Sequence, residues 1–235
     1  MAQVAATSHG CLVLTGGGRA ILLGSPAGTA AVRELAGNAS AIAVQAGRML
    51  IASARKVLVL AGENGSQVAS LPVEQGASAL GLVGGGRLLA VGYDAGDLEL
   101  VPVQPGTVKP AFSFEETIPS SVERISEGPR QTLIAGYASG DLGIWSLETG
   151  KRLRHFKLHG PIIHLLVDSE TRRLYAATEV GDYRVIDLAA LYQDYCELLA
   201  DVWSNVPVLW QAGIPALAPP PASHRCPASS PLQRR

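Results

Sequence analysis

Three stretches of the chain repeat one order of hydrophobic and polar positions. In each, an apolar run leads into a Gly-Asp turn, and a segment in which large and small side chains alternate follows the turn. The repeats lie about 40 residues apart, and an interval of this size indicates stacked structural units. The three stretches are Gly86–Val103, Arg130–Leu147 and Arg172–Leu188.

Each repeat predicts a β-hairpin. The apolar run lacks polar alternation, which is typical of a strand covered on both faces, whereas the alternating segment suits a strand with one closely packed face. At the turn, glycine accepts a positive φ without steric cost, and the following aspartate can hydrogen-bond nearby backbone amides. A second hypothesis is that the three aspartates form an acidic rim for a cationic peptide or a metal. The expected structural turn residues are Gly96, Asp97, Gly140, Asp141, Gly181 and Asp182.

Fainter copies upstream raise the number of units to five. Gly47–Gly62 keeps both strands but carries Arg55 and Lys56 in place of Gly-Asp, and Gly16–Leu35 keeps only the outline. The spacing is that of four-stranded propeller blades.

The segment His159–Leu188 resembles a full unit of the WD-repeat β-propellers. It opens with His-Gly, continues through three apolar strands separated by polar turns, and closes near Asp187. Trp145 occupies the position of the family's tryptophan, followed by Ser146 where aspartate is usual. The resemblance implies an all-β fold, a β-propeller of about five four-stranded WD-like blades over residues 1–188.

The pattern does not decide whether the five units close into a ring. No fourth strand follows the last unit after Leu188, so we expect Ala2–Thr7 to supply that strand from the other end of the chain. Cys11–Leu14 is then the first strand of the first unit. This pairing would protect sheet edges. The alternative is an open arc of five units, which a second or a longer chain would complete.

The hydrophobic period changes after the last repeat. Apolar side chains recur every three or four residues up to Val206, which predicts an amphipathic helix of about five turns within residues 189–211, stopped by Pro207. Its apolar stripe either packs on the propeller or docks a partner protein. Residues 212–235 are rich in Pro, Ser and Ala and predict a disordered or polyproline-like tail. The expected partner-binding residues are Tyr195, Trp203 and Trp210.

Composition narrows the classes of partner and compartment. The net charge of −1 supplies no positive field for a phosphate backbone, so we expect no nucleic-acid binding. No apolar run is long enough to span a bilayer and the first residues do not form a secretory signal, so we expect a cytoplasmic protein that does not bind membranes. Cys11, Cys196 and Cys226 are far apart and odd in number, which predicts free thiols rather than a disulfide framework or a zinc site.

Catalytic motifs are not found in the sequence. The chain has no G-x-S-x-G, HExxH or GxxxxGK[ST] pattern, and its two Gly-Gly-Gly runs precede predicted strands rather than helices. The predicted first strands offer only Glu123 and His164 as inward-facing polar candidates. We therefore expect a protein that is not an enzyme, with no catalytic, cofactor-binding or metal-binding residues.

These observations favour a non-catalytic scaffold for protein–protein interaction, of the WD-repeat β-propeller type, whose partners are other proteins. Rigid stacked units present a broad surface without needing a reactive side chain. One alternative is a regulatory sensor that binds a small ligand in the propeller channel. A less favoured alternative is a propeller hydrolase, which would need inward-facing acids or histidines.

Overall fold

The chain folds into two units, Met1–Ile186 and Asp187–Arg235. The regular structure described in the first unit consists of β-strands. The computed structural model describes residues 3–7, 10–24, 32–62, 65–74, 76–104, 112–205, 208–211, 214–217 and 226.

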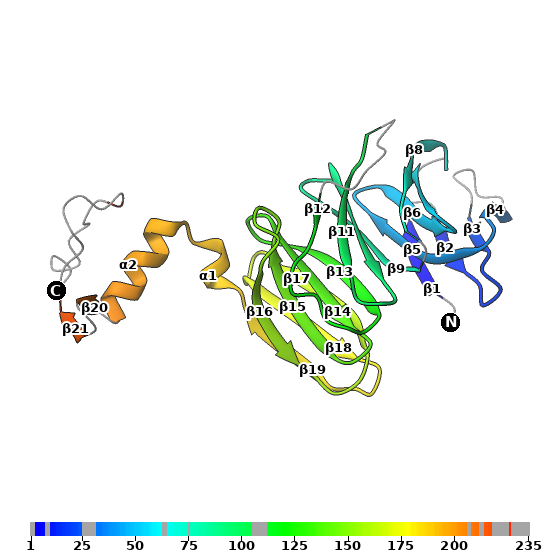
Figure 1. Cartoon of the computed structure of the whole chain (residues 1–235). Helices are drawn as coiled ribbons and strands as arrows, with labels where there is room; N and C mark the ends of the chain where they lie inside the picture. Colours follow the sequence, from blue (N-terminus) through cyan, green and yellow to red (C-terminus); the bar gives the residue numbers. More distant parts are fainter. Residues whose placement is uncertain are drawn as a thin grey trace. The chain divides into compact units, whose positions relative to one another are not determined.

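Five antiparallel sheets follow one another along the first unit (Figure 1). The first contains β1 (Gln3–Thr7), β2 (Gly10–Leu14), β3 (Ala20–Leu23) and β4 (Val32–Ala36). The second contains β5 (Ala39–Gln45), β6 (Arg48–Ser53), β7 (Lys56–Ala61) and β8 (Gln67–Pro72). The third contains β9 (Ala77–Val83), β10 (Leu88–Tyr93), β11 (Leu98–Pro102) and β12 (Phe112–Ser113). The fourth contains β13 (Val122–Gly128), β14 (Thr132–Tyr137), β15 (Asp141–Ser146) and β16 (Arg152–Lys157). The fifth contains β17 (Ile162–Asp168), β18 (Arg173–Thr178) and β19 (Tyr183–Asp187).

Each sheet is a simple meander, in which every strand pairs with its neighbours in the sequence. The three repeats form the predicted hairpins, β10 with β11, β14 with β15 and β18 with β19. All-β structure and the hairpins are therefore confirmed.

The expected role of the N-terminal strand is wrong. β1 pairs with β2, from Gln3 opposite Leu14 to Thr7 opposite Gly10, and is thus the first strand of the first sheet. Cys11–Leu14 lies in the second strand, not the first. The pairing is favoured because β1 and β2 are neighbours in the sequence and meet locally, whereas pairing with the last sheet would require closing a loop across the whole unit. The fifth sheet consequently has three strands among the described residues.

Neighbouring sheets contact each other through their first strands. β1 packs beside β5, β5 beside β9, β9 beside β13, and β13 beside β17. In the described part of the chain, β17 and β1 do not pack against each other in this way. The row of five sheets is therefore continuous from first to last, and its two ends are not joined by a comparable contact.

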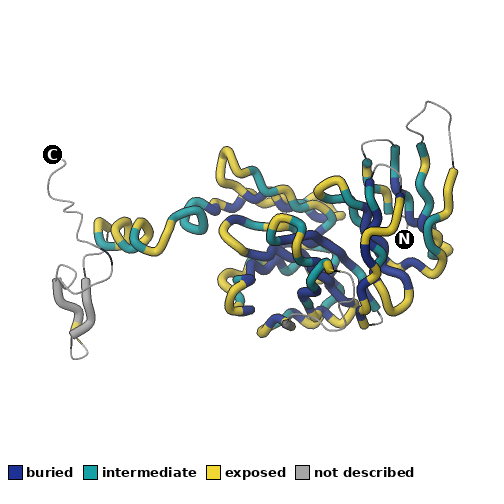
Figure 2. Tube along the Cα trace, turned by 90° about the horizontal axis from the view of Figure 1, so that it is seen from above, coloured by how far each residue is buried: buried dark blue, intermediate teal, exposed yellow. Residues whose placement is uncertain are grey.

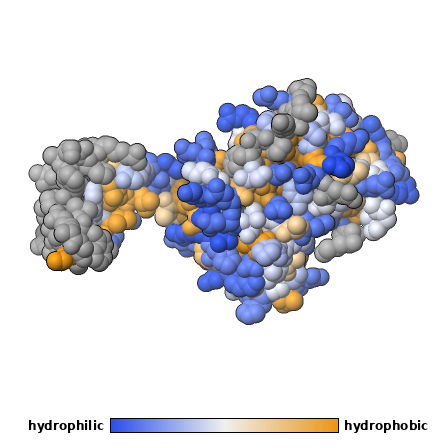
Figure 3. Space-filling view, in the orientation of Figure 1, coloured by the Kyte–Doolittle hydropathy of each residue, from blue (hydrophilic) through white to orange (hydrophobic). Residues whose placement is uncertain are grey.

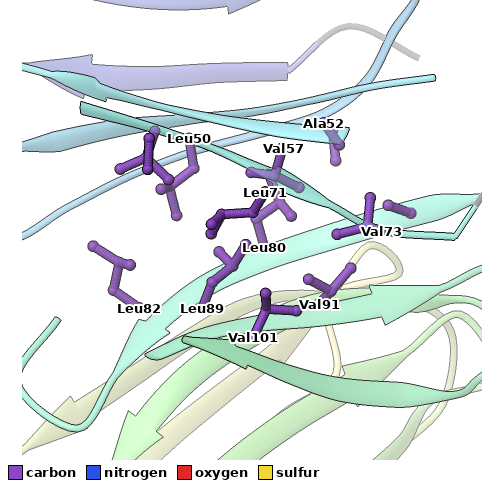
Figure 4. Close-up of a cluster of buried hydrophobic side chains, with 14 of the residues drawn as sticks. Leu50, Ala52, Val57, Leu71, Val73, Leu80, Leu82, Leu89, Val91 and Val101 are labelled. Atoms are coloured by element: carbon purple, nitrogen blue, oxygen red, sulfur yellow. The ribbon is translucent and has the colours of Figure 1, made fainter. Parts of the chain in front are cut away.

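Hydrophobic layers fill the spaces between neighbouring sheets. Figure 4 shows the layer between the second and third sheets, where the side chains of both sheets point toward one another. Burial of such side chains stabilises the fold by about 1.5–3 kcal/mol each. The labelled members are Leu50, Ala52, Val57, Leu71, Val73, Leu80, Leu82, Leu89, Val91 and Val101.

The second unit contains two short helices, α1 (Ala189–Tyr192) and α2 (Tyr195–Asn205), and a hairpin of β20 (Val208–Gln211) and β21 (Ile214–Leu217). The expected single helix of about five turns is thus interrupted. Asp194 accepts a hydrogen bond from the Glu197 amide (2.8 Å), and Glu197 accepts one from the Asp194 amide (2.9 Å). This reciprocal cap starts a new helix, which overrides the continuous hydrophobic period.

Two further features of the second unit differ from the sequence expectations. Ile214–Leu217 is a paired strand rather than part of a disordered tail. Cys196 and Cys226 form a disulfide, so only Cys11 is free. The two cysteines are 30 residues apart in sequence, and nothing in their spacing alone indicated the pairing. No helix in the described residues is long and apolar enough to cross a membrane.

Burial separates the two units clearly. The tube in Figure 2 is dark blue along the central strands of the first unit, whereas α1 and α2 are teal and yellow. Neither helix contains a buried residue.

Candidate functional site

A cavity of about 360 Å³ lies where the first strands of all five sheets meet. Each of the five strands contributes to its wall, so residues from opposite ends of the row face one space. The lining residues are Gln3, Val4, Ala5, Ile42, Ala43, Val44, Gln45, Ser78, Ala79, Leu80, Glu123, Arg124, Ile125, Ile163 and His164.

Side chains of the first strands tie each sheet to the next through main-chain groups. Such bonds fix the spacing of the sheets, because a buried carbonyl or amide without a partner is costly. The bonds follow one another from the first sheet to the fifth. Gln3 Oε1 accepts from Ile42 N (3.2 Å), Ser40 Oγ donates to Ala77 O (2.6 Å), Ser78 Oγ donates to Val122 O (2.8 Å), and Arg124 Nε donates to Ile163 O (2.7 Å).

The ionisable side chains of the cavity come from β13 and β17. Glu123 and His164, the two inward candidates of the sequence, both line it, and Arg124 joins them. The Arg124 guanidinium also donates from Nη1 to the Glu123 carbonyl oxygen (2.6 Å), so its orientation is fixed by two main-chain acceptors. The sequence analysis missed Arg124. The sequence signal that could have identified Arg124 is its position next to Glu123 in the predicted first strand of its unit.

The chemistry available in the cavity is limited. Glu123 is the single carboxylate in the described lining, so these residues do not form the carboxylate pair that hydrolysis of a glycosidic bond uses. Among the described residues there is also no group of three or more His, Cys, Asp or Glu side chains placed to hold a metal ion. The lining can hydrogen-bond a small polar molecule.

The turn glycines adopt the predicted backbone conformation. The φ values of Gly96, Gly140 and Gly181 are +99°, +85° and +87°. A Cβ on Gly96 would collide with the Ile118 carbonyl oxygen, and one on Gly140 would collide with that of Leu158.

The turn aspartates hold neighbouring segments. Asp141 accepts from Lys157 Nζ (2.7 Å) and lies 2.8 Å from His155 Nε2, and Ser139 also donates to it. Burial raises the pKa of Asp141, but the hydrogen bonds from Lys157, Ser139 and His155 outweigh burial and lower it to about 2. This carboxylate is engaged within its own sheet.

The other two turn aspartates make weaker contacts. Asp182 accepts from the backbone amide of His159 (2.9 Å), and its pKa is lowered first by that bond and then by the His159 side chain. Asp97 lies 3.5 Å from Thr117 Oγ1. Asp141 and Asp182 accept hydrogen bonds from Lys157 and from the His159 amide, which lie outside their own turns, so these two carboxylates join segments of the fold and are not free to form an acidic rim.

The proposed partner-binding residues lie in the second unit. Tyr195 is 50% exposed and Trp203 is half-buried, both on α2. Trp210 belongs to β20, but its side chain lies outside the described residues.

Each end of the row of sheets has an apolar face that no sheet of the described residues covers. In the fifth sheet a groove of about 400 Å³ is lined by Leu166, Tyr175 and Tyr183, which are 63%, 36% and 75% exposed, together with His164, Ala176, Ala177 and Arg184. In the first sheet Val4 and Leu23 are 68% and 41% exposed. Figure 3 shows apolar residues (orange) among the polar ones (blue) on the face of the molecule that it draws. The sequence analysis missed both faces, because the same apolar residues would be buried in an inner sheet.

The fold defines an all-β protein built from a row of antiparallel sheets. No family model matches the chain. No curated protein matches it either. Among solved structures 1521 chains match. One is the crystal structure of the computationally designed Ika4 protein, with 16% identity and a TM-score of 0.52 over 64% of this chain and 91% of that chain. At this identity the likeness concerns the fold alone.

Proposed function

We propose that the chain is a non-catalytic scaffold for protein–protein interaction, built as a degenerate β-propeller of the WD-repeat type. The five sheets are its blades, and the first strands that surround the cavity are the inner strands of those blades. Support for this arrangement comes from the hydrogen bonds that join each first strand to the next. Its partners are other proteins.

One observation carries the proposal, the pair of uncovered apolar faces on the first and fifth sheets. Isolated exposed apolar side chains are ordinary, but contiguous ones on the face of a sheet mark a surface that another protein covers. Tyr175 and Tyr183 strengthen the argument, because tyrosine is enriched among the residues that contribute most to binding.

The helix α2 is a second docking element in this proposal. Tyr195, Leu198 and Val202 are 50%, 37% and 48% exposed, and they recur at helical spacing on one side. The competing role, a cap on the propeller, makes a different prediction. Removing residues 189–235 lowers the melting temperature of the propeller if the helix is a cap and leaves it unchanged if the helix docks a partner.

Photo-crosslinking tests the scaffold. A benzophenone side chain placed at Tyr183 or at Leu23 should give protein adducts in the cells that produce the chain. The control position is Val68, which is 44% exposed on an edge strand of the second sheet and should give none. Adducts at neither face, from a folded protein, would overturn the proposal.

A sensor for a small polar ligand is a second candidate, favoured by Glu123, Arg124 and His164 on the cavity wall. A ligand of this kind should raise the melting temperature of the wild-type chain. The rise should be lost in Glu123→Gln if the ligand contacts that carboxylate. A set of small polar metabolites screened without any shift would remove this candidate.

A further inference from the structure

The first strands of the second to fifth sheets share a β-bulge at the same place. In each of β5, β9, β13 and β17, the second residue of the strand has no partner opposite it in the neighbouring second strand. A bulge of this kind bends the strand and changes the direction of the side chains beside it. The bulged residues are Ser40, Ser78, Glu123 and Ile163.

Serine at the bulge joins one sheet to the next. Ser40 Oγ donates to the Ala77 carbonyl oxygen (2.6 Å), and Ser78 Oγ donates to that of Val122 (2.8 Å). Both acceptors belong to the first residue of the following first strand. A hydroxyl group suits this role because it can donate a hydrogen bond to a carbonyl oxygen.

The fourth sheet departs from this pattern. Its bulged residue is Glu123, and an ionised carboxylate cannot donate to a carbonyl oxygen. The neighbouring Arg124 makes the bond to the next sheet instead, from Nε to Ile163 O (2.7 Å). Within the described part of the chain, the Glu123 carboxylate makes no hydrogen bond or ion pair. This side chain therefore does not join the sheets, and it lies in the cavity wall with its acceptors unused.

The bulge also brings opposite charges to one space. Adjacent residues of a regular strand point to opposite faces, yet Glu123 and Arg124 both line the cavity. The Arg124 guanidinium uses Nε and Nη1 for main-chain acceptors, which leaves Nη2 for a ligand. With His164 neutral, the ionisable groups of the described wall carry one positive and one negative charge.

Two glutamines add N–H donors to the wall. Gln3 Oε1 accepts from Ile42 N (3.2 Å), and Gln45 Oε1 accepts from Leu82 N. Because a main-chain N–H occupies each amide oxygen, the amide NH₂ group is the part of each glutamine that remains for a ligand. The wall thus offers N–H donors from Gln3, Gln45 and Arg124 and a carboxylate acceptor from Glu123.

We propose that this cavity binds a free amino acid. The carboxylate of the ligand accepts from Arg124 Nη2 and the glutamine amides, and its ammonium group donates to Glu123. Such a zwitterion pairs both charges of the wall, whereas a simple anion leaves Glu123 without a partner and a simple cation leaves Arg124 without one. The volume of about 360 Å³ is within the range of small-molecule sites.

This ligand goes beyond the scaffold function. It rests on the second candidate function, the sensor, and names the chemical class that the sensor detects.

The melting temperature of the purified full chain, measured with each of the common amino acids at millimolar concentration, is the first test. At least one amino acid should raise it, because a ligand that binds the folded state stabilises that state. Two derivatives of that amino acid are then compared with it by calorimetric titration. The N-acetyl derivative lacks the ammonium group and the amide lacks the carboxylate, and each should bind about tenfold more weakly or worse, because each loses a charged hydrogen bond.

Variants of Glu123 separate binding from folding. Glu123→Ser gives the fourth sheet the bulge residue of the second and third, so it should fold as the wild type does and bind the amino acid at least about tenfold more weakly. Glu123→Gln keeps the size of the side chain and should lose the preference for the free amino acid over its N-acetyl derivative. The control is Glu148→Gln, which removes an exposed carboxylate between β15 and β16 and should bind as the wild type does.

Three results would overturn the amino-acid ligand. These are no rise in melting temperature with any amino acid, equal affinities for the amino acid and its two derivatives, and wild-type binding by a folded Glu123→Ser. A rise with another polar metabolite and with no amino acid would leave the sensor standing while removing this ligand class. The crosslinking experiment at Tyr183 and Leu23 decides the scaffold function independently of all of these outcomes.

Discussion

Ile162 lies directly over Gly136, so that a Cβ on the glycine would come within 2.6 Å of Ile162 Cγ2. Val122 covers Gly92 in the same way, with a closest approach of 2.5 Å. The glycine of the repeated Gly-Tyr pair therefore makes room for the first strand of the following sheet. In β18 the corresponding residue is Ala177, and no sheet follows it in the described structure.

Gly136→Ala should destabilise the protein by about 1–3 kcal/mol, because the added methyl group overpacks the contact with Ile162. Urea denaturation followed by tryptophan fluorescence, to which the fully buried Trp145 contributes, measures the change in the free energy of unfolding. The matched control is Gly16→Ala, where a Cβ would meet nothing within 4 Å. Equal stabilities of the two variants would contradict the explanation.

The turn glycines allow strain and collision to be separated. Gly181→Ala incurs only the cost of a positive φ, roughly 1 kcal/mol, because nothing lies within 4 Å of its Cβ position. Gly140→Ala incurs the same strain and also the collision with the Leu158 carbonyl oxygen. We expect Gly140→Ala to be the more destabilising by at least about 1 kcal/mol in urea denaturation. Equal effects would show that the loop before β17 moves aside freely.

Asp141 should make stability depend on pH in a defined window. Its pKa is lowered from 3.8 to about 2 in the folded protein, so its contribution is complete above the unfolded value and is lost as the pH falls toward 2. Asp141→Asn should cost about 1–2 kcal/mol at pH 7, allowing for partial solvent screening, and almost nothing near pH 2.

Denaturant titrations of the wild type and of Asp141→Asn at several pH values measure this difference. Asp168→Asn is the control, since the Asp168 pKa is also lowered, first by Thr171, but the side chain is solvent-exposed. Its effect on stability should be small throughout. A difference between Asp141→Asn and the wild type that does not change with pH would contradict the assignment.

The repeats made the strands and hairpins predictable, because Leu142–Trp145 and its counterparts carry local signals of period and turn chemistry. The role of Gly92 and Gly136 was not predictable from one sequence, since the side chains that cover them come from the next unit. Glu123 and His164, the two inward candidates of the sequence, do line the cavity, but so does the adjacent Arg124, because the register of β13 shifts between Val122 and Arg124 and simple alternation does not hold there.

Long-range features could not be predicted from the sequence, for a physical reason. The N-terminal strand can pair with its neighbour in the sequence or with a distant sheet edge. Its apolar composition is compatible with both partners and does not distinguish them. Which apolar faces stay uncovered depends on where the row of sheets ends, as at Leu166. The pairing of Cys196 with Cys226 depends on the path of the chain between them, for which periodicity carries no information.

The disulfide should hold the second unit together. No residue of α1 or α2 is buried, so the helices gain little from hydrophobic burial, and a bridge closing a 30-residue loop stabilises by about 3–4 kcal/mol in the chain-entropy model. Reduction should therefore speed proteolysis within Asp187–Arg235 while Met1–Ile186 resists. Mass spectrometry of the fragments after limited proteolysis, with and without reductant, measures both rates.

Two variants complete that experiment. Cys226→Ser should be cut rapidly without reductant, and Cys11→Ser, which removes the free thiol, should behave as the wild type.

The same bridge tests the predicted cytoplasmic location, because structural disulfides are rare where glutathione keeps thiols reduced. Thiol labelling in intact cells should modify Cys196 and Cys226 if the protein is cytoplasmic and should spare them in an oxidising compartment. Labelling of Cys11 alone would therefore show that the cytoplasmic prediction is wrong, since the bridge is then intact where the protein resides.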